Sequence, residues 1–106
     1  MQLWIALLLC GSALVAHAQE SEPMWIDVRS ASEFSTGHVE GAINIEFGDI
    51  VAGLQQREVA AHTNIILYCG SGKRSGMALQ SLRQAGYENL TNAGGVDQAR
   101  ALKASQ

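Results

Sequence analysis

The segment Asn64-Ile65-Ile66-Leu67-Tyr68 constrains the fold more than any other part of the sequence. Its continuous apolar run has the length of a strand and lacks the polar–apolar alternation of a strand with one face in water. A strand of this kind is buried on both faces, as in a parallel sheet covered by helices. Directly after it come Cys69 and a loop, residues 70–76, with three glycines and two cations.

Other segments alternate between strand and helix patterns along the chain. Further strands are expected at 24–28, 41–45 and 89–93, and helices after Ser30, over 47–54, at 75–85 and at 96–104. This alternation predicts an α/β fold: a single domain with a central, mostly parallel sheet and helices on both faces. Ligand crevices of such sheets lie at the carboxyl ends of the strands. Cys69 falls at one of these ends, which favours a functional role.

The predicted helices carry recognisable start and stop signals. Ser30 and Glu33 match a capping box, and Gly37 predicts that the helix they begin is short. The second helix has Phe47, Ile50, Val51 and Leu54 at the spacing of one apolar face. Gly86 is expected to end the third helix, and Trp25 and Phe34 are expected to lie in the core.

The first 18 residues have the layout of a secretory signal peptide. They contain no Asp, Glu, Lys or Arg, and their apolar run ends in the small-x-small pattern Ala16-His17-Ala18. A permanent membrane anchor is the alternative, but the run is shorter than the ~20 residues that a span needs. We expect cleavage after about Ala18, which removes Cys10 and leaves the domain 19–106 in the periplasm, free of the membrane.

The net charge and the number of cysteines limit which partners and which cysteine chemistry are expected. The formal net charge of −3 comes without a basic tail or stripe, which argues against nucleic acid as a partner. With Cys10 removed, Cys69 is the one cysteine left, so no intramolecular disulfide can form. Such a cysteine is a buried structural residue, an intermolecular bridge or a thiol kept for its reactivity. The glycine-rich basic loop beside it favours the last of these.

The spacing of residues in the loop distinguishes nucleotide binding, phosphate-ester hydrolysis and sulfur transfer. A P-loop needs a glycine at position 67 and Ser or Thr after Lys73, but the sequence has Leu67 and Arg74. A phosphatase of the C-x5-R type needs arginine at position 75, which is Ser75; arsenate reductases are disfavoured by the same count. Arg74 makes the spacing C-x4-R, and the smaller ring suits a persulfide sulfur better than a phosphoryl group. The count favours sulfur transfer.

Four segments in order resemble single-domain rhodaneses, which are thiosulfate sulfurtransferases. The segments are "WIDVR" (25–29), "SASEFSTGHVEGAINI" (30–45), "IILYCGSGKRSG" (65–76) and "GYENLTNAGG" (86–95). The export signal and small size make the chain most similar to the periplasmic phage-shock protein E type. The resemblance implies that Cys69 carries a persulfide and moves a sulfane sulfur from thiosulfate to cyanide or a thiol acceptor. It implies a monomer without metal or organic cofactor; a non-catalytic sulfur carrier or sensor module is the alternative.

The loop after Cys69 has the chemistry to bind an anionic sulfur species. Its glycines permit a tight bend in which successive N–H groups point inward. The following helix adds the positive end of its dipole, and the two cations add positive potential. These features should lower the pKa of the Cys69 thiol. The expected substrate-binding residues are therefore Gly70, Ser71, Gly72, Lys73, Arg74 and Ser75, with Lys73 and Arg74 alternatively solvated at the surface.

The remaining polar residues have simpler expected roles. Arg29 is expected to pair with a nearby carboxylate, with direct substrate contact as the minor alternative. Asp27 is expected to bond backbone groups near the loop. His38 is expected to serve packing and turn geometry, because attack on thiosulfate requires no proton removal, and His62 is expected to have no role. One cysteine and scattered histidines do not have the spacing of metal ligands.

Overall fold

A computed structural model of the chain describes residues 22–106, so the predicted export signal lies outside the described residues. Along the chain the elements are β1 (Met24–Asp27), α2 (Ala31–Ser35), β2 (Ile43–Asn44), the 3-10 helix η1 (Phe47–Asp49), α3 (Ile50–Gln56), β3 (Asn64–Tyr68), α4 (Lys73–Gln84), β4 (Asn89–Asn92) and α5 (Val96–Ala104). Over the described range, no helix combines the length and hydrophobicity needed to cross a bilayer.

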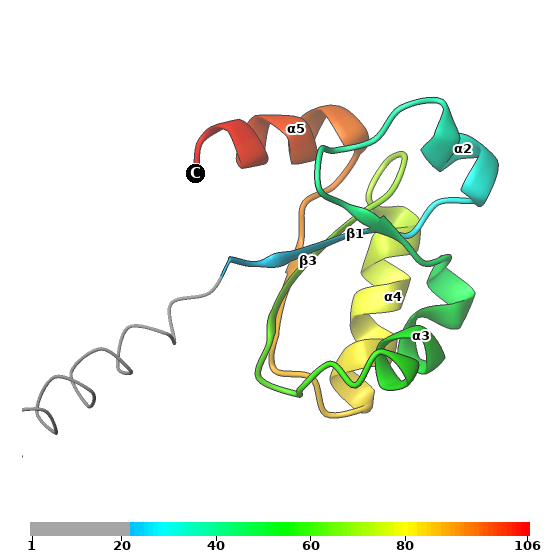
Figure 1. Ribbon diagram of the computed structural model, residues 1–106, viewed down its shortest axis with the longest axis vertical. Coiled ribbons are helices and arrows are strands. Elements are labelled where there is room, and N and C mark those ends of the chain that lie inside the picture. The colour runs from blue at the N-terminus through cyan, green and yellow to red at the C-terminus, as the bar shows by residue number, and fades with distance from the viewer. Residues whose placement is uncertain (1–21) are drawn as a thin grey trace, which may run out of the picture.

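The four strands form one sheet in the order β2-β1-β3-β4, and every neighbouring pair is parallel. Ile26 of β1 lies opposite Leu67 of β3, which in turn lies opposite Asn92 of β4. The inner position of β3 explains its continuous apolar sequence, because both of its faces are covered. The predicted α/β architecture with a parallel sheet is confirmed (Figure 1).

The two faces of the sheet have separate cores. Ile65 and Leu67 pack with residues of α3 and α4, whereas Ile66 and Tyr68 point to the opposite face and pack with Ala99 of α5. Accordingly, α5 lies on one side of the sheet and α3 and α4 lie on the other (Figure 1). The period of two along β3 therefore assigns alternate apolar side chains to the two layers.

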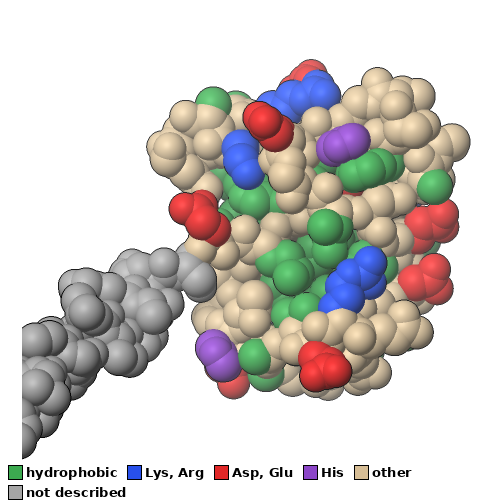
Figure 2. Space-filling view, viewed as in Figure 1, with side chains coloured by type: hydrophobic (Ala, Val, Ile, Leu, Met, Phe, Trp, Pro, Cys, Tyr) green, Lys and Arg blue, Asp and Glu red, His purple; other side chains and the backbone are tan. Residues whose placement is uncertain are grey.

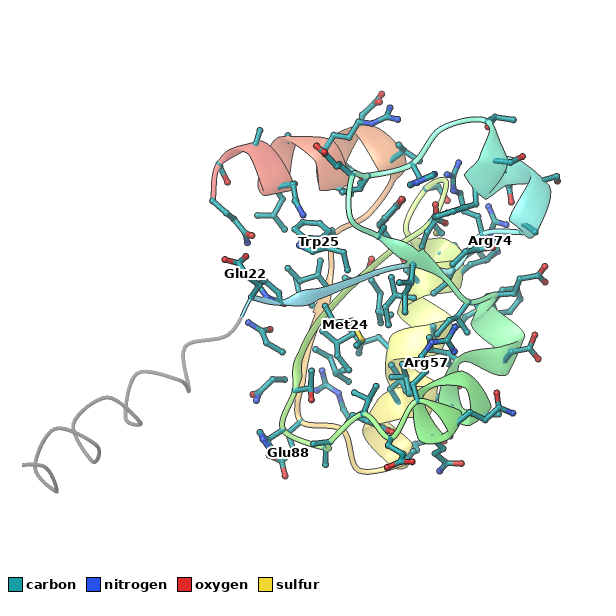
Figure 3. The ribbon with its side chains drawn as sticks, viewed as in Figure 1. Glu22, Met24, Trp25, Arg57, Arg74 and Glu88 are labelled. Carbon is teal, nitrogen blue, oxygen red and sulfur yellow. The ribbon has the colours of Figure 1, made fainter. Side chains whose placement is uncertain are left out.

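One face of the domain leaves hydrophobic side chains in view. They gather in its middle (Figure 2), where Met24 and Arg57 also lie (Figure 3). β2 pairs only with Ile26 and Asp27 of β1, so it does not extend along Met24. Met24 is accordingly half-buried and packs at the border of the core on the α3 and α4 side.

The helix signals in the sequence are largely confirmed. The Ser30 hydroxyl accepts from the Glu33 N–H, the Glu33 carboxylate accepts from the Ser30 N–H, and α2 ends before Gly37, which has φ +146°. The helix predicted at 96–104 has these bounds. By contrast, α4 begins at Lys73 rather than at residue 75, because Gly72 takes the left-handed conformation that ends the preceding turn.

The two aromatic predictions have different outcomes. Trp25 is buried, as expected. Phe34 was expected in the core, which is wrong: it is only half-buried, and its ring stacks on exposed His38 at 3.6 Å between centroids. The short helix α2 buries none of its residues, so its aromatic side chain has no core to enter. His38 has the packing role predicted for it, and its Nδ1 lies 2.8 Å from the Phe34 carbonyl oxygen.

Candidate active site

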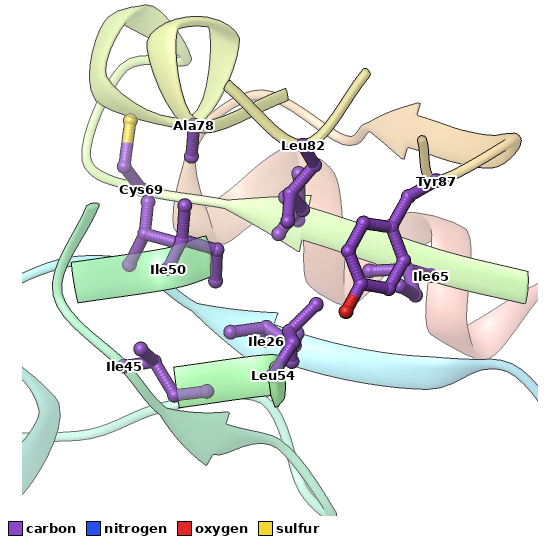
Figure 4. Close-up of a cluster of buried hydrophobic side chains, with 11 residues drawn as sticks. Ile26, Ile45, Ile50, Leu54, Ile65, Cys69, Ala78, Leu82 and Tyr87 are labelled. Carbon is purple, nitrogen blue, oxygen red and sulfur yellow. The ribbon is translucent and has the colours of Figure 1, made fainter. Parts of the chain in front are cut away.

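Cys69 occupies the carboxyl end of β3, in the middle of the sheet. Its backbone N–H donates to the Gly94 carbonyl over 3.0 Å, and its side chain is fully buried. It forms one end of the cluster that contains Ile50 and Ala78, with its sulfur pointing toward the turn that begins α4 (Figure 4). The thiol is therefore located where parallel α/β sheets bind ligands.

The loop after Cys69 surrounds the sulfur with hydrogen-bond donors. The Gly72 N–H lies 3.0 Å from Sγ, and the N–H and hydroxyl of Ser75 each lie 3.4 Å from it. The expected inward-pointing N–H groups are thus present. The expected conformational role of the glycines is correct only in part: Gly72 has φ +103°, whereas Gly70 and Gly76 do not take left-handed values.

These donors make the Cys69 thiol more acidic than an ordinary cysteine. Burial raises the pKa of the Cys69 thiol, but hydrogen bonds from the Ser75 hydroxyl and from the N–H groups of Ser75, Ser71 and Gly72 outweigh burial and lower the pKa to about 7. The N-terminus of the 12-residue helix α4 adds roughly half a positive charge at the same place. About half of the molecules then hold a thiolate at neutral pH, against a few per cent for a free cysteine with pKa ~8.5.

We expect alkylation of Cys69 by iodoacetamide to follow this ionisation. The rate should rise with pH around a midpoint near 7, and the same protein unfolded in urea should show the free-thiol midpoint. Because the folded pKa lies below that of a free cysteine, the thiolate adds stability that is complete above the free-cysteine pKa and is lost as the pH falls through about 7. Equal midpoints for folded and unfolded protein would contradict the role of the loop.

The two cations of the loop have different environments. Arg74 donates from Nη1 and Nη2 to the two carboxylate oxygens of Glu33 over 2.8 and 3.1 Å, whereas Lys73 is exposed. Hydrogen bonds from Arg74 and then from Ser30 lower the pKa of Glu33 to about 2. Arg74 therefore extends toward α2 (Figure 3), where its ion pair with Glu33 holds it. A substrate contact for either cation stays a prediction.

Asp27 and Arg29 form a buried ion pair at the end of β1. Arg29 Nη2 lies 2.7 Å from Asp27 Oδ2 and also donates to the Gly37 carbonyl over 2.7 Å. Asp27 Oδ1 accepts from the Arg29 N–H over 2.9 Å. The predicted pairing of Arg29 and the predicted backbone contact of Asp27 are both present. The pair connects the end of β1 to the segment after α2, close to the carboxyl edge of the sheet.

Asn92, at the end of β4, is a residue that sequence reasoning missed. Its Nδ2 donates to the Gly72 carbonyl over 3.0 Å, and its Oδ1 accepts from the Ser75 hydroxyl over 2.7 Å and from the Gly94 N–H over 3.0 Å. One amide thus links the loop, α4 and the segment before α5. An asparagine at the end of a predicted strand carries no local signal of these contacts.

The segment before α5 approaches the loop closely at Gly95. A Cβ added there would lie 2.5 Å from the Gly70 carbonyl oxygen, although φ is −89°, a value any residue adopts. We therefore expect Gly95→Ala to displace the loop, to cost about 1–3 kcal/mol through overpacking and to return the thiol pKa toward its free value. Gly48→Ala is the matched control, because a Cβ at Gly48 meets nothing within 4 Å. Alkylation profiles that do not differ between the two variants would contradict this expectation.

Open hollows flank the loop on two sides. One, of about 330 Å³, is lined by residues that include Gly70, Gly95 and Asp97. The other, of about 610 Å³, lies along α4 and includes Lys73 and Met77. In residues 22–106 there is no cluster of three or more acidic, histidine or cysteine side chains able to hold a metal ion. Both hollows reach residues of the loop that follows Cys69.

A family model described as the rhodanese-like domain matches residues 12–101. This chain belongs to the rhodanese family. Among its relatives, the thiosulfate sulfurtransferase PspE of Escherichia coli is 35% identical over 92 residues, which cover 87% of this chain and 85% of that protein. The putative sulfur carrier protein YrkF of Bacillus subtilis is 28% identical over 67 residues, 63% of this chain and 35% of that protein.

Solved structures of rhodanese domains share this fold. An E. coli rhodanese determined with anions superposes with a TM-score of 0.69 at 32% identity, covering 73% of this chain and 91% of that one. The rhodanese-like domain of the Anabaena protein Alr3790 gives a TM-score of 0.70 at 26% identity, covering 76% and 93%. The predicted family and the predicted fold are both confirmed, and membership places the chain among sulfurtransferase-type proteins.

Proposed function

We propose that this rhodanese is a thiosulfate sulfurtransferase that carries sulfur as a persulfide on Cys69. The observation that carries the proposal is the set of three donor groups, the N–H of Gly72 and the N–H and hydroxyl of Ser75, that lie 3.0–3.4 Å from Sγ. They stabilise negative charge on the sulfur, which the nucleophilic thiolate and the anionic persulfide both require. The name of the E. coli relative, thiosulfate sulfurtransferase, supports the same substrate.

The first step transfers a sulfur atom to the protein. The Cys69 thiolate attacks the outer sulfur of thiosulfate, a new S–S bond forms, the old S–S bond breaks, and sulfite leaves with the electron pair. The negative charge then rests on the outer sulfur of the persulfide. In this proposal the substrate and the persulfide are bound by residues 70–75, with their N–H groups as the principal donors.

The second step returns the free thiolate. Cyanide or an acceptor thiolate attacks the outer persulfide sulfur, and Cys69 leaves as a thiolate, giving thiocyanate or an acceptor persulfide. Both steps balance in atoms and electrons without a metal or an organic cofactor. Because the Cys69 side chain is fully buried, the proposal also requires that the loop give the donor access to the sulfur.

Mass spectrometry of the protein after incubation with thiosulfate tests the proposal. We expect the peptide that contains Cys69 to gain the mass of one sulfur atom and to lose it when cyanide is added. A protein that never acquires this mass, under conditions in which iodoacetamide still reaches Cys69, would exclude the persulfide. Prior alkylation of Cys69 is the matched negative control.

A non-catalytic sulfur carrier or sensor is the second candidate function, and it is favoured by the name of the B. subtilis relative, a putative sulfur carrier protein. Both candidate functions begin with formation of the Cys69 persulfide, and they differ in whether thiocyanate is then produced continuously. A carrier forms one persulfide and releases it only to its partner, whereas an enzyme forms thiocyanate continuously from thiosulfate and cyanide. A steady-state assay with both small molecules therefore separates them.

Export and a monomeric state are part of the same proposal. We infer that the signal is cleaved after about Ala18 and that the domain acts in the periplasm as a monomer, without nucleic acid or membrane contacts. The charge-free, apolar segment 1–18 supports this inference. Sequencing the N-terminus of the protein recovered from the periplasm of a Gram-negative host, together with its mass in solution by light scattering, tests both points.

A further inference from the structure

The hydroxyl of Ser75 lies between two acceptors. Its Oγ is 3.4 Å from the Cys69 sulfur and 2.7 Å from the Asn92 amide oxygen, and Ser75 is fully buried. A serine hydroxyl has one hydrogen, so it can donate to only one of these two atoms at a time. Cys69 and Asn92 therefore compete for the same proton.

The orientation of the Asn92 amide is determined by its other contacts. Its Nδ2 faces the Gly72 carbonyl, and its Oδ1 faces the Gly94 N–H. A flipped amide would set the nitrogen against the Gly94 N–H and the oxygen against the Gly72 carbonyl, so both bonds would be lost. Asn92 thus presents an acceptor to Ser75, and the short contact between them requires that Ser75 donate.

We propose that Asn92 is a positioning residue that holds the Ser75 hydroxyl proton while the Cys69 sulfur is neutral and yields it when the thiolate forms. With a neutral thiol, Ser75 donates to Asn92 and its oxygen is free to accept from the S–H group. With a thiolate, the hydroxyl rotates toward the sulfur, because a hydrogen bond to a charged acceptor is stronger than one to a neutral amide. Asn92 Oδ1 then still accepts the hydrogen bond from the Gly94 N–H.

This inference deepens the proposed function, because the same thiolate attacks the sulfur donor. The charged groups around the thiol do not replace Asn92 in this role. Arg74 on α4 acts on Cys69 electrostatically and is paired with Glu33 of α2. Lys73 on α4 is exposed, and Asp97 lies in the first turn of α5. None of them is a hydrogen-bond partner of the Ser75 hydroxyl, which contacts Cys69 and Asn92.

The test measures ionisation of Cys69 in the full chain through the pH dependence of its alkylation. Asn92→Asp gives up the Nδ2 bond to the Gly72 carbonyl but keeps the acceptor oxygen and makes it anionic, so it should hold the Ser75 proton more strongly. We expect the alkylation midpoint to rise by about one pH unit or more, which leaves roughly tenfold less thiolate at a given pH below the midpoint. In a Ser75→Ala background the same substitution should raise the midpoint by less than half as much.

Asn89→Asp is the matched control, because Asn89 lies at the other end of β4, where its Nδ2 donates to the His62 carbonyl. It changes the net charge equally and should leave the midpoint in place. If Asn92→Asp raises the alkylation midpoint equally in the parent and in the Ser75→Ala background, simple charge repulsion explains the effect and the proposal is overturned. A midpoint that does not shift at all would also overturn it. Failure of sulfur transfer itself would not affect this measurement.

The main readout of a second measurement uses the unaltered protein, so it does not depend on the folding of a variant. The side-chain amide signals of Asn92 in an NMR pH titration should move with the same midpoint as Cys69 alkylation. They should stop moving when Cys69 is replaced by alanine. Asn92 signals that stay constant while Cys69 ionises would overturn the proposal.

Discussion

Replacing Cys69 by alanine should lower the rate of thiocyanate formation from thiosulfate and cyanide by about a thousandfold or more. The reason is that the substitution removes the nucleophile and the sulfur carrier together. Cys69→Ser is the companion variant. It keeps a polar atom in the ring of donors, but a serine hydroxyl remains protonated and forms no persulfide. Turnover in a steady-state assay is the measurement, with thermal unfolding to verify that each variant is folded.

Comparing the alanine and serine variants separates the chemical role of the Cys69 sulfur from its role in packing and hydrogen bonding. Cys69 lies in the buried core cluster, and it also supplies the acceptor for the Gly72 N–H. Alanine therefore removes a packing contact and leaves that donor without its partner. Activity within tenfold of the parent protein in either folded variant would remove Cys69 from the mechanism and overturn the proposed Cys69 persulfide.

Asp27→Ala should lower the free energy of unfolding by about 3–5 kcal/mol, the usual cost of removing one partner of a buried ion pair. The remaining Arg29 is only 7% exposed, so its charge would be left without compensation in the interior. Such a loss is a large part of the roughly 5–15 kcal/mol by which most domains are stable. Urea unfolding followed by circular dichroism measures the change.

Asp49→Ala is the control for this prediction, since Asp49 is exposed and makes no capping hydrogen bond at the start of α3. It removes the same charge from the protein and should change stability by less than about 0.5 kcal/mol. If Asp27→Ala also stays within that range, water or another group must compensate Arg29. In that case the ion pair would not be what holds the end of β1 to the segment after α2.

The parts of the fold that sequence patterns predicted are those with a local physical cause. The apolar run of β3 has to be buried on both faces, and the structure places it inside the sheet with its side chains alternating between two cores. The capping box at Ser30 and the helix at 96–104 depend on residues a few positions apart. Phe34 shows the limit of such reasoning, because hydrophobic character alone does not say whether a core lies beneath a short helix.

The sequence by itself determined the α/β architecture, the position of Cys69 after a buried strand and the donors of its own loop, because these depend on periodicity and on neighbouring residues. Only the tertiary structure decided that Glu33 binds Arg74, that Gly95 abuts Gly70, and that Asn92 accepts a hydrogen bond from the Ser75 hydroxyl. These contacts join residues brought together at the carboxyl edge of a parallel sheet. Because each crossover returns the chain to that edge after many residues, no local pattern specifies which side chains meet there.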